Sequence, residues 1–320
     1  MKALQGVDGH VEWVEAERPT CDAGQVRIRV AAAGLNRADL LQMKGLYPPP
    51  PGVPARTWGW SVPGWLKRWG LVPIGAWVIA FAPCQQRRHG RGSGGGCPSC
   101  AAGAEGLGLH EAAALPEVYA TAWLNIFQLG AVKAGEKVLV HAGASGVGSA
   151  AIQLCKAFGS PVWVSVGSQD RLAYCQALGA AGGVVRNENL EALEGFGPFD
   201  VILDPVGASY GELNLKLLAR DGRWVIIGLM GGRKFELDLA QVLGKRLEIT
   251  GSTLRNRDDG FKAELLSELQ QHVWPLFAEG RLSPQLVDTY PVEFAQAAYA
   301  ELETNQVSGK LVMVIDPSLV

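Results

Sequence analysis

The chain has 320 residues, of which 48% are hydrophobic and 19% charged. This length exceeds one compact core of ordinary size and predicts two globular domains. A formal net charge of -2 gives no electrostatic reason to expect a nucleic acid or an acidic membrane as the main partner, and we expect no dedicated nucleic-acid surface.

The amino-terminal segment, MKALQGVDGHVEWVE, carries charges where a secretory signal peptide needs an unbroken apolar stretch. We therefore expect a cytoplasmic protein. Six irregularly spaced cysteines argue against a disulfide framework. Residues 55–81 are apolar, but prolines and basic residues interrupt every window of the about 20 residues that a membrane span requires, so we expect no membrane partner.

The first third of the chain is predicted to be rich in strands. In QVRIRV, Val26, Ile28 and Val30 alternate with arginines, which is the period of a half-buried strand. The composition then changes: no Asp or Glu occurs between Leu40 and Ala104, and residues 55–81 hold five of the ten tryptophans. We expect residues 55–104 to be irregular or disordered.

From Glu111 the pattern is that of an α/β domain. EAAALPEVYATAWLNIFQLG predicts an Ala- and Leu-rich helix, and five short apolar runs predict buried strands: EKVLVHAG, PVWVSVGS, FDVILDPVG, GRWVIIG and RLEITGS. VGSAAIQLCKAFG and DRLAYCQALGA predict helices between the earlier strands. Strands alternating with helices predict a doubly wound parallel sheet covered on both faces. After about Asp258 we expect a long amphipathic helix, a strand at QLVDTYPV and a closing strand at GKLVMVI.

The first strand-to-helix turn of this domain, VHAGASGVGSAAIQ, is a candidate phosphate site. Gly143 permits a tight turn, and Gly146 and Gly148 allow backbone and helix to approach closely, so that helix amides face a pyrophosphate. Any tight turn between strand and helix can also use glycine. The strand before and the helix after favour a dinucleotide.

The end of the next strand indicates which dinucleotide binds. Proteins that bind NAD place Asp or Glu there for the ribose 2′-hydroxyl, whereas this turn offers Gly167, Ser168 and Arg171. A hydroxyl and a guanidinium suit a 2′-phosphate, which a carboxylate would repel. The sequence therefore favours NADPH. The alternative is that Arg171 is a solvated helix residue paired with Asp170.

An ordered set of segments resembles one enzyme family. AAAGLNRADLLQMKGLYPPPPG, EAAALPEVYATAWLNIF, VHAGASGVGSAAIQL, LDPVGASY, GSTLRNR and NQVSGKLV are similar to the zinc-independent quinone oxidoreductases of the medium-chain dehydrogenase/reductase superfamily, most of all to the branch typified by the p53-inducible enzyme. The resemblance implies a Rossmann domain at residues 119–257 and a GroES-like β-barrel domain from residues 1–118 and 258–320, usually in a homodimer.

The same resemblance implies the site residues. It places Asn36 and Tyr47 beside the nicotinamide and the quinone, as the catalytic pair. The implied cofactor contacts are Thr121, Ser145, Gly146, Val147, Ser168, Arg171, Gly228 and Lys310. The tyrosine that relatives place after LGA is missing from LGAAGGVVRNEN. Tyr47 could instead pack a loop, Asn36 could be only a helix cap, and Asp204 could be purely structural.

A bound metal is not expected. Cys97 and Cys100 form one Cys-x-x-Cys and only Cys84 is near, so a structural zinc would need a further ligand such as His89. The basic run QQRRHGRG is interpreted as a loop.

Residues 55–104 replace a family pattern that supplies strands of the barrel. If the codons from residue 55 are read from their last base, Trp58 with Gly59, Trp69 with Gly70 and Trp77 with Val78 each force a glycine, and the unknown bases permit the first part of the missing pattern. A second change of register near Cys84 allows the rest, and the family pattern resumes near Glu105. We interpret residues 55 to about 104 as the product of a compensated frameshift, in the gene or in its reading.

The expected activity is hydride transfer from NADPH to a small quinone, without a metal or a covalent nucleophile. One alternative is reduction of an activated alkene such as an enone, enal or enoyl thioester. Another is an NADPH-binding protein without catalytic activity.

Overall fold

The computed structural model describes residues 2–7, 10–15, 25–46, 66–67, 69–73 and 106–320. The chain divides into two compact units, one formed by Met1–Glu117 with Arg255–Val320 and the other by Val118–Leu254. Each unit has its own sheets and its own buried core. None of the helices in the described ranges is both long enough and apolar enough to cross a membrane.

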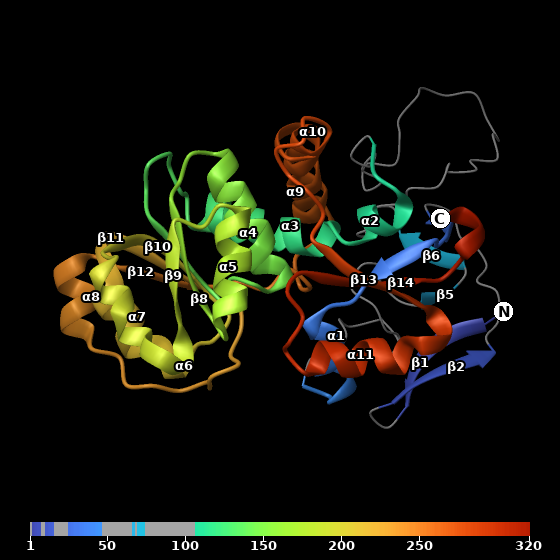
Figure 1. Ribbon diagram of the computed structural model, residues 1–320, viewed down its shortest axis with the longest axis horizontal. Helices are drawn as coiled ribbons and strands as arrows, with labels where there is room; N and C mark the ends of the chain where they lie inside the picture. The colour runs from blue at the N-terminus through green and yellow to red at the C-terminus, as the bar shows by residue number, and fades with distance from the viewer. Residues whose placement is uncertain (1, 8–9, 16–24, 47–65, 68, 74–105) are drawn as a thin grey trace. The chain divides into compact units, whose positions relative to one another are not determined.

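A six-stranded parallel sheet forms the centre of the Val118–Leu254 unit (Figure 1). All five predicted strands are present: β7 (Val138–His141), β8 (Val162–Val166), β10 (Phe199–Asp204), β11 (Leu218–Ile226) and β12 (Glu248–Gly251). A sixth strand, β9 (Gly182–Val185), completes the order β12-β11-β10-β7-β8-β9. The chain order reverses between β7 and β10, and ligands of such sheets bind beyond the carboxyl ends of the strands at that point.

Helices cover both faces of this sheet, as Figure 1 shows. α4 (Gly146–Ala157) and α5 (Gln169–Leu178) pack on one face, and α7 (Gly211–Leu217) and α8 (Leu239–Lys245) lie on the other. All four residues of β7 are buried as a result, which is typical of a parallel strand enclosed by two helix layers. The predicted doubly wound α/β fold is confirmed.

Two of the predicted elements differ in detail from the structure. The helix expected from Glu111 is three successive pieces, α2 (Leu109–Ala113), α3 (Pro116–Trp123) and the π-helical η1 (Leu124–Leu129). The prediction of one continuous helix was wrong. Proline has no backbone N–H to donate and favours the first turn of a helix, so Pro116 begins a new helix. β12 was expected to be buried, but it is the edge of the sheet and its side chains are exposed or half-buried.

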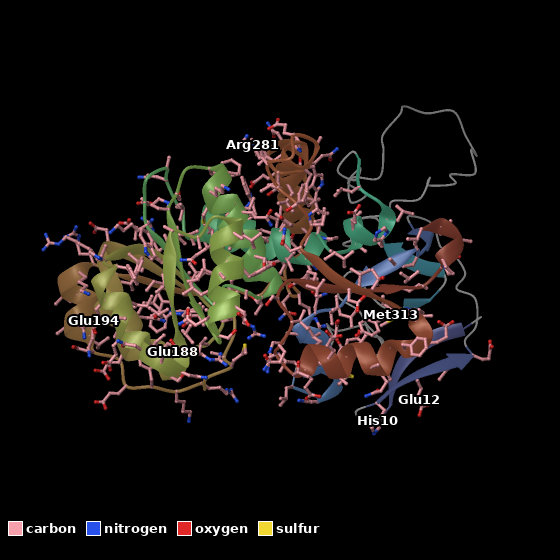
Figure 2. All side chains as sticks on the ribbon, in the orientation of Figure 1. His10, Glu12, Glu188, Glu194, Arg281 and Met313 are labelled. Carbon is pink, nitrogen blue, oxygen red and sulfur yellow. The ribbon has the colours of Figure 1, made fainter. Side chains whose placement is uncertain are left out.

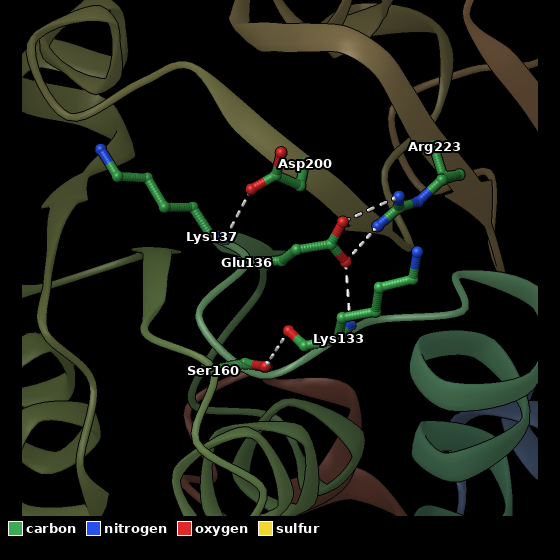
Figure 3. A network of polar contacts seen from close by, with 6 residues as sticks. All are labelled: Lys133, Glu136, Lys137, Ser160, Asp200 and Arg223. Carbon is green, nitrogen blue, oxygen red and sulfur yellow. Dashed lines mark hydrogen bonds and ion pairs between the residues drawn. The ribbon is translucent and has the colours of Figure 1, made fainter.

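A network of polar contacts closes the amino end of the sheet (Figure 3). The guanidinium of Arg223 on β11 donates two hydrogen bonds to the carboxylate of Glu136, at 3.1 and 2.6 Å. That carboxylate also accepts the backbone N–H of Lys133 at 2.8 Å, and Asp200 on β10 accepts the backbone N–H of Lys137 at 2.7 Å. These bonds tie the segment before β7 to two neighbouring strands.

The described residues of the other unit form three small sheets. Their orders are β2-β1-β5, β13-β14-β4 and β3-β6. The strands are β1 (Lys2–Val7), β2 (His10–Glu15), β3 (Gln25–Arg29), β4 (Ala32–Gly34), β5 (Leu66–Lys67), β6 (Trp69–Pro73), β13 (Leu286–Pro291) and β14 (Lys310–Val314).

Two short strands contradict part of the expectation for residues 55–104. β5 pairs with β1, and β6 pairs antiparallel with β3 from Gln25 to Arg29. Irregular structure was the wrong expectation for the residues of these two strands, because strand β3 offers backbone N–H and C=O groups that require partners whatever side chains the partner carries. The other residues of 55–104 lie outside the described part of the chain.

The core of this unit joins both ends of the chain. α1 (Arg37–Met43) and α11 (Ala295–Glu303) share it with β14, and Met313 of β14, labelled in Figure 2, is fully buried. The predicted amphipathic helix is α9 (Asp259–His272), whose first turn is capped by Asp258. The remaining helical elements are α6 (Arg186–Asn189), α10 (Trp274–Ala278), η2 (Leu190–Gly195), η3 (Ala208–Tyr210), η4 (Val292–Phe294) and η5 (Pro317–Leu319).

Candidate functional site

The turn between β7 and α4 leaves no space for side chains at two of its glycines. A Cβ on Gly143 would lie 2.5 Å from Val164 of β8, and one on Gly148 would lie 2.4 Å from the carbonyl oxygen of Gly143. Helix α4 therefore begins in direct contact with the backbone of the turn. This is the close approach that a diphosphate-binding turn requires.

Ser145 starts helix α4 at this turn. Its side-chain oxygen accepts the N–H of Gly148 at 3.1 Å, and its carbonyl oxygen accepts the hydroxyl of Ser149 at 2.8 Å. Gly146 and Val147 follow as the first residues of the helix and are half-buried. A twelve-residue helix presents its first amides and the positive end of its dipole here, which suits an anion.

The turn after β8 brings a guanidinium over a glycine. A Cβ on Gly167 would lie 3.1 Å from Nη1 of Arg171. Ser168 is the N-cap of α5, and its hydroxyl oxygen accepts the N–H of Arg171 at 3.4 Å. Partial burial lowers the pKa of Arg171, and the nearby charge of Arg186 lowers it further. Arg186 was not among the predicted site residues.

A buried polar network lies behind the carboxyl ends of these strands. His141, the last residue of β7, contacts the hydroxyl of Ser165 through Nδ1 and the side-chain oxygen of Asn214 through Nε2, both at 2.8 Å. Asn214 donates its amide to Asp204 at 3.1 Å, so its oxygen must accept from His141 Nε2–H. Burial lowers the pKa of His141, against the opposing effects of the Asp204 charge and the Asn214 hydrogen bond, which favours a neutral imidazole with its proton on Nε2.

Asp204 holds the loop that follows β10. Its fully buried carboxylate accepts four hydrogen bonds, from the backbone N–H groups of Val206 and Gly207 and from the side chains of Asn214 and Trp224. Gly228 packs against this loop, where a Cβ would lie 2.7 Å from the Pro205 carbonyl oxygen. The arrangement favours the structural reading of Asp204.

In the other unit the structure brings Asn36 and Lys310 together. The buried ammonium of Lys310 donates to the Asn36 side-chain oxygen at 2.5 Å and to the Leu35 carbonyl oxygen. Asn36 occupies the N-cap position of α1, but its own N–H is bound by the Asp39 carboxylate at 2.9 Å, while its amide donates to Gly34 at 3.2 Å. The side chain of Asn36 is thus held by Lys310 and Gly34 and does more than cap the helix.

Asp39 is a second buried group that the sequence reasoning missed. One carboxylate oxygen accepts from Asn36 N–H and, at 3.4 Å, from the Tyr299 hydroxyl; the other has no hydrogen-bond partner among the described residues. Burial raises the pKa of Asp39 to about 7, against the opposing effects of the Asn36 hydrogen bond and the Lys310 charge. Burial lowers the pKa of Lys310 in turn.

The remaining predicted residues divide into two cases. Thr121 lies on α3, where its carbonyl oxygen accepts the side-chain amide of Asn125 at 2.7 Å. Tyr47 lies outside the described residues. The four residues considered as zinc ligands, Cys84, His89, Cys97 and Cys100, lie outside them as well. Among described residues no group of three metal-ligand side chains is present.

Comparison with known proteins finds similarity to dehydrogenases and to polyketide synthases. Residues 146–271 match the family described as zinc-binding dehydrogenase. The spectinabilin polyketide synthase system protein NorB of Streptomyces orinoci is 31% identical over 92% of this chain. The chain spans only 5–18% of the length of the first polyketide synthases it matches.

Solved structures match 98% of this chain. The quinone oxidoreductase of Thermus thermophilus, which was also solved with NADPH, is 27% identical with a TM-score of 0.80, covering 98% of this chain and 100% of that one. CurK enoyl reductase is 23% identical with a TM-score of 0.76, covering 98% of each chain. The chain shares the two-domain α/β fold of these dehydrogenases and reductases.

Proposed function

We propose that this chain binds NADPH on its Val118–Leu254 unit and reduces a small quinone. The observation that carries the proposal is the pair of turns after β7 and β8. The first has no space for Cβ atoms at Gly143 and Gly148, and the second offers Gly167, Ser168 and the guanidinium of Arg171 where NAD-binding proteins carry a carboxylate. The similarity to a quinone oxidoreductase solved with NADPH supports the same conclusion.

The residues present fit the cofactor. When bound, NADPH supplies the hydride chemistry. Ser145, Gly146 and Val147 would bind its diphosphate through backbone N–H groups, and Ser168 and Arg171 would bind its 2′-phosphate. Thr121, Gly228 and Lys310 are proposed for the nicotinamide half. Asn36, whose side-chain oxygen accepts from Lys310, would orient the ring together with Tyr47.

The catalytic assignment is tested by removing one hydroxyl. In Tyr47→Phe we expect quinone turnover to fall by up to about a hundredfold, because a mispositioned substrate reacts slowly, while NADPH affinity stays unchanged. Tyr290→Phe removes a hydroxyl bonded to Glu301 and serves as the matched control. Unchanged turnover of Tyr47→Phe would remove Tyr47 from the mechanism.

A second candidate is reduction of an activated alkene with the same cofactor. It is favoured by the matches to polyketide synthases over more than nine-tenths of this chain, and CurK enoyl reductase shares the fold. Parallel assays with a quinone and an enone separate the two substrates. Binding of NADPH without turnover of either would favour a non-enzymatic NADPH-binding protein.

We also propose a homodimer formed through the edge of the large sheet. β12 pairs only with β11 among the described strands, so its other edge offers unpaired backbone groups. Large apolar side chains are exposed in β12 and in the segment leading to it, namely Leu229, Met230, Phe235, Leu237, Leu239, Leu243 and Ile249. Sedimentation of the intact chain tests this, and a monomer at micromolar concentration would contradict it.

The origin of residues 55–104 is proposed to be a compensated frameshift, and the family branch is proposed to be that of the p53-inducible quinone oxidoreductase. The forced glycines at the Trp58, Trp69 and Trp77 codons support the first proposal. An intact barrel pattern in the corrected reading would support both.

A further inference from the structure

Arg186 lies beside the turn after β8 because of the sheet register. β8 and β9 run parallel, and Val166 of β8 pairs with Val185 of β9. These are the last residues of the two strands. The next residues along the chain, Gly167 and Arg186, therefore leave the same edge of the sheet next to each other.

The side chains of Arg186 and Arg171 converge on one point. An ideal Cβ on Gly167 would lie 3.1 Å from Nη1 of Arg171 and 3.8 Å from Nη2 of Arg186. Both guanidinium nitrogens are thus within 4 Å of that point. Glycine at 167 leaves this space open, since any side chain there would fill it.

No acidic group of the described chain neutralises Arg186. It forms no ion pair with any described carboxylate. The nearest glutamate in sequence, Glu188 (Figure 2), instead accepts a hydrogen bond from Gln169 at 2.8 Å. Two like charges this close repel each other. The repulsion is relieved when a doubly charged anion lies between them.

The two guanidinium groups beside Gly167 suit a phosphate monoester as their ligand. A guanidinium binds phosphate oxygens through two parallel N–H groups, and a pair of them matches a dianion in charge. The hydroxyl of Ser168 is at the same turn. A carboxylate-bearing ligand would satisfy one guanidinium and leave the other uncompensated.

We propose that Arg186 is a second ligand of the NADPH 2′-phosphate. The phosphate lies above Gly167 between the guanidinium groups of Arg171 and Arg186, and these two charges set the preference for NADPH over NADH. This rests on the proposed function, which it deepens by one specificity residue. The preference for NADPH then depends on two positive charges from neighbouring strand ends, and removal of either charge weakens it.

The test is Arg186→Gln, measured by titration of the intact chain with NADPH and with NADH. We expect NADPH affinity to fall about tenfold to a hundredfold, the usual loss for one charge-assisted contact, and NADH affinity to stay unchanged. The affinity for 2′,5′-ADP, which carries the same 2′-phosphate, should fall by the same factor, whereas inorganic phosphate at equal concentration should not compete with NADPH in either protein.

Arg220→Gln is the matched control, because Arg220 is exposed and lies near the start of β11, at the amino end of the sheet. It removes the same charge and should leave both affinities unchanged. Equal loss of NADPH and NADH affinity in Arg186→Gln, or no loss, overturns the inference while the proposed function stands. An unaltered chain that binds neither nucleotide overturns the proposed function itself.

Discussion

Gly148 illustrates how strictly single positions of the first turn are determined. A Cβ there would lie 2.4 Å from the backbone oxygen of Gly143. We expect Gly148→Ala to lower the free energy of unfolding by about 1–3 kcal/mol and to abolish measurable NADPH binding, because α4 must shift away from the turn. Thermal unfolding and titration of the same sample measure both.

Gly244→Ala is the control for that variant. Gly244 also lies within a helix, but no atom approaches its Cβ position within 4 Å. Alanine there should raise stability by up to about 1 kcal/mol. Equal effects of the two substitutions would contradict the close approach of α4 to its turn.

Asp39 gives a pH dependence at the scale of one side chain. Its pKa is raised from 3.8 to about 7 by burial, so the folded state binds a proton more tightly than the unfolded state. The free energy of unfolding therefore falls as pH rises from about 4 to about 7, and this loss of stability is complete above about pH 7. Asp39→Asn should remove that slope and be more stable than the parent at pH 8, on the order of 2–4 kcal/mol.

Urea unfolding at pH 5 and pH 8 measures this effect. The neutral amide that replaces the carboxylate in Asp39→Asn keeps an oxygen that can accept the Asn36 N–H. A parent protein as stable at pH 8 as at pH 5, with no gain in the variant, would show that Asp39 is not held in an apolar site.

At the scale of elements, the Glu136 network should stabilise the sheet without affecting the site. Burial raises the pKa of Glu136, but the bonds from Arg223 and Lys133 outweigh it and the pKa lies below its ordinary value. Its stabilisation is therefore present above about pH 5 and is lost as pH falls through the lowered pKa. Glu136→Gln should cost about 1–3 kcal/mol at pH 7 and leave NADPH affinity unchanged; a changed affinity would contradict a purely structural role.

The sequence predicted elements well wherever apolar runs were continuous. The strands β7, β8, β10 and β11 each carry such a run, but β9 was missed because it opens with Gly182 and Gly183, which are poor strand formers. The structure shows why glycine is needed at the second position: a Cβ on Gly183 would lie 2.4 Å from the carbonyl oxygen of Val164. The close contact between β8 and β9 requires glycine at position 183, and glycine is a residue that does not predict a strand.

Site residues that lie close together in sequence could be predicted. Site residues whose position depends on elements distant in sequence could not. Ser145 and Gly148 share one turn and could be found from spacing. Arg186 could not, because its role depends on the register of β9, the strand that escaped prediction. Asp39 was also missed, since nothing local in RADLLQ distinguishes a buried aspartate from a solvated one.

At the scale of the whole molecule, the frameshift proposal makes a prediction about the gene. Sequencing the coding DNA from independent clones should reveal an inserted or deleted base near codon 55, a second change of register near codon 84 and recovery of the present frame near codon 105. Correction should restore acidic residues and the barrel pattern. An unambiguous reading of the present frame in every clone would contradict an error in the reading.

The decisive experiment on the proposed NADPH-dependent reductase is nucleotide binding by the intact, purified chain, with a quinone added afterwards to the same sample. We expect NADPH to bind at least about tenfold more tightly than NADH and to be oxidised when quinone is added. Equal or tighter binding of NADH, or binding of neither nucleotide, would contradict this proposal.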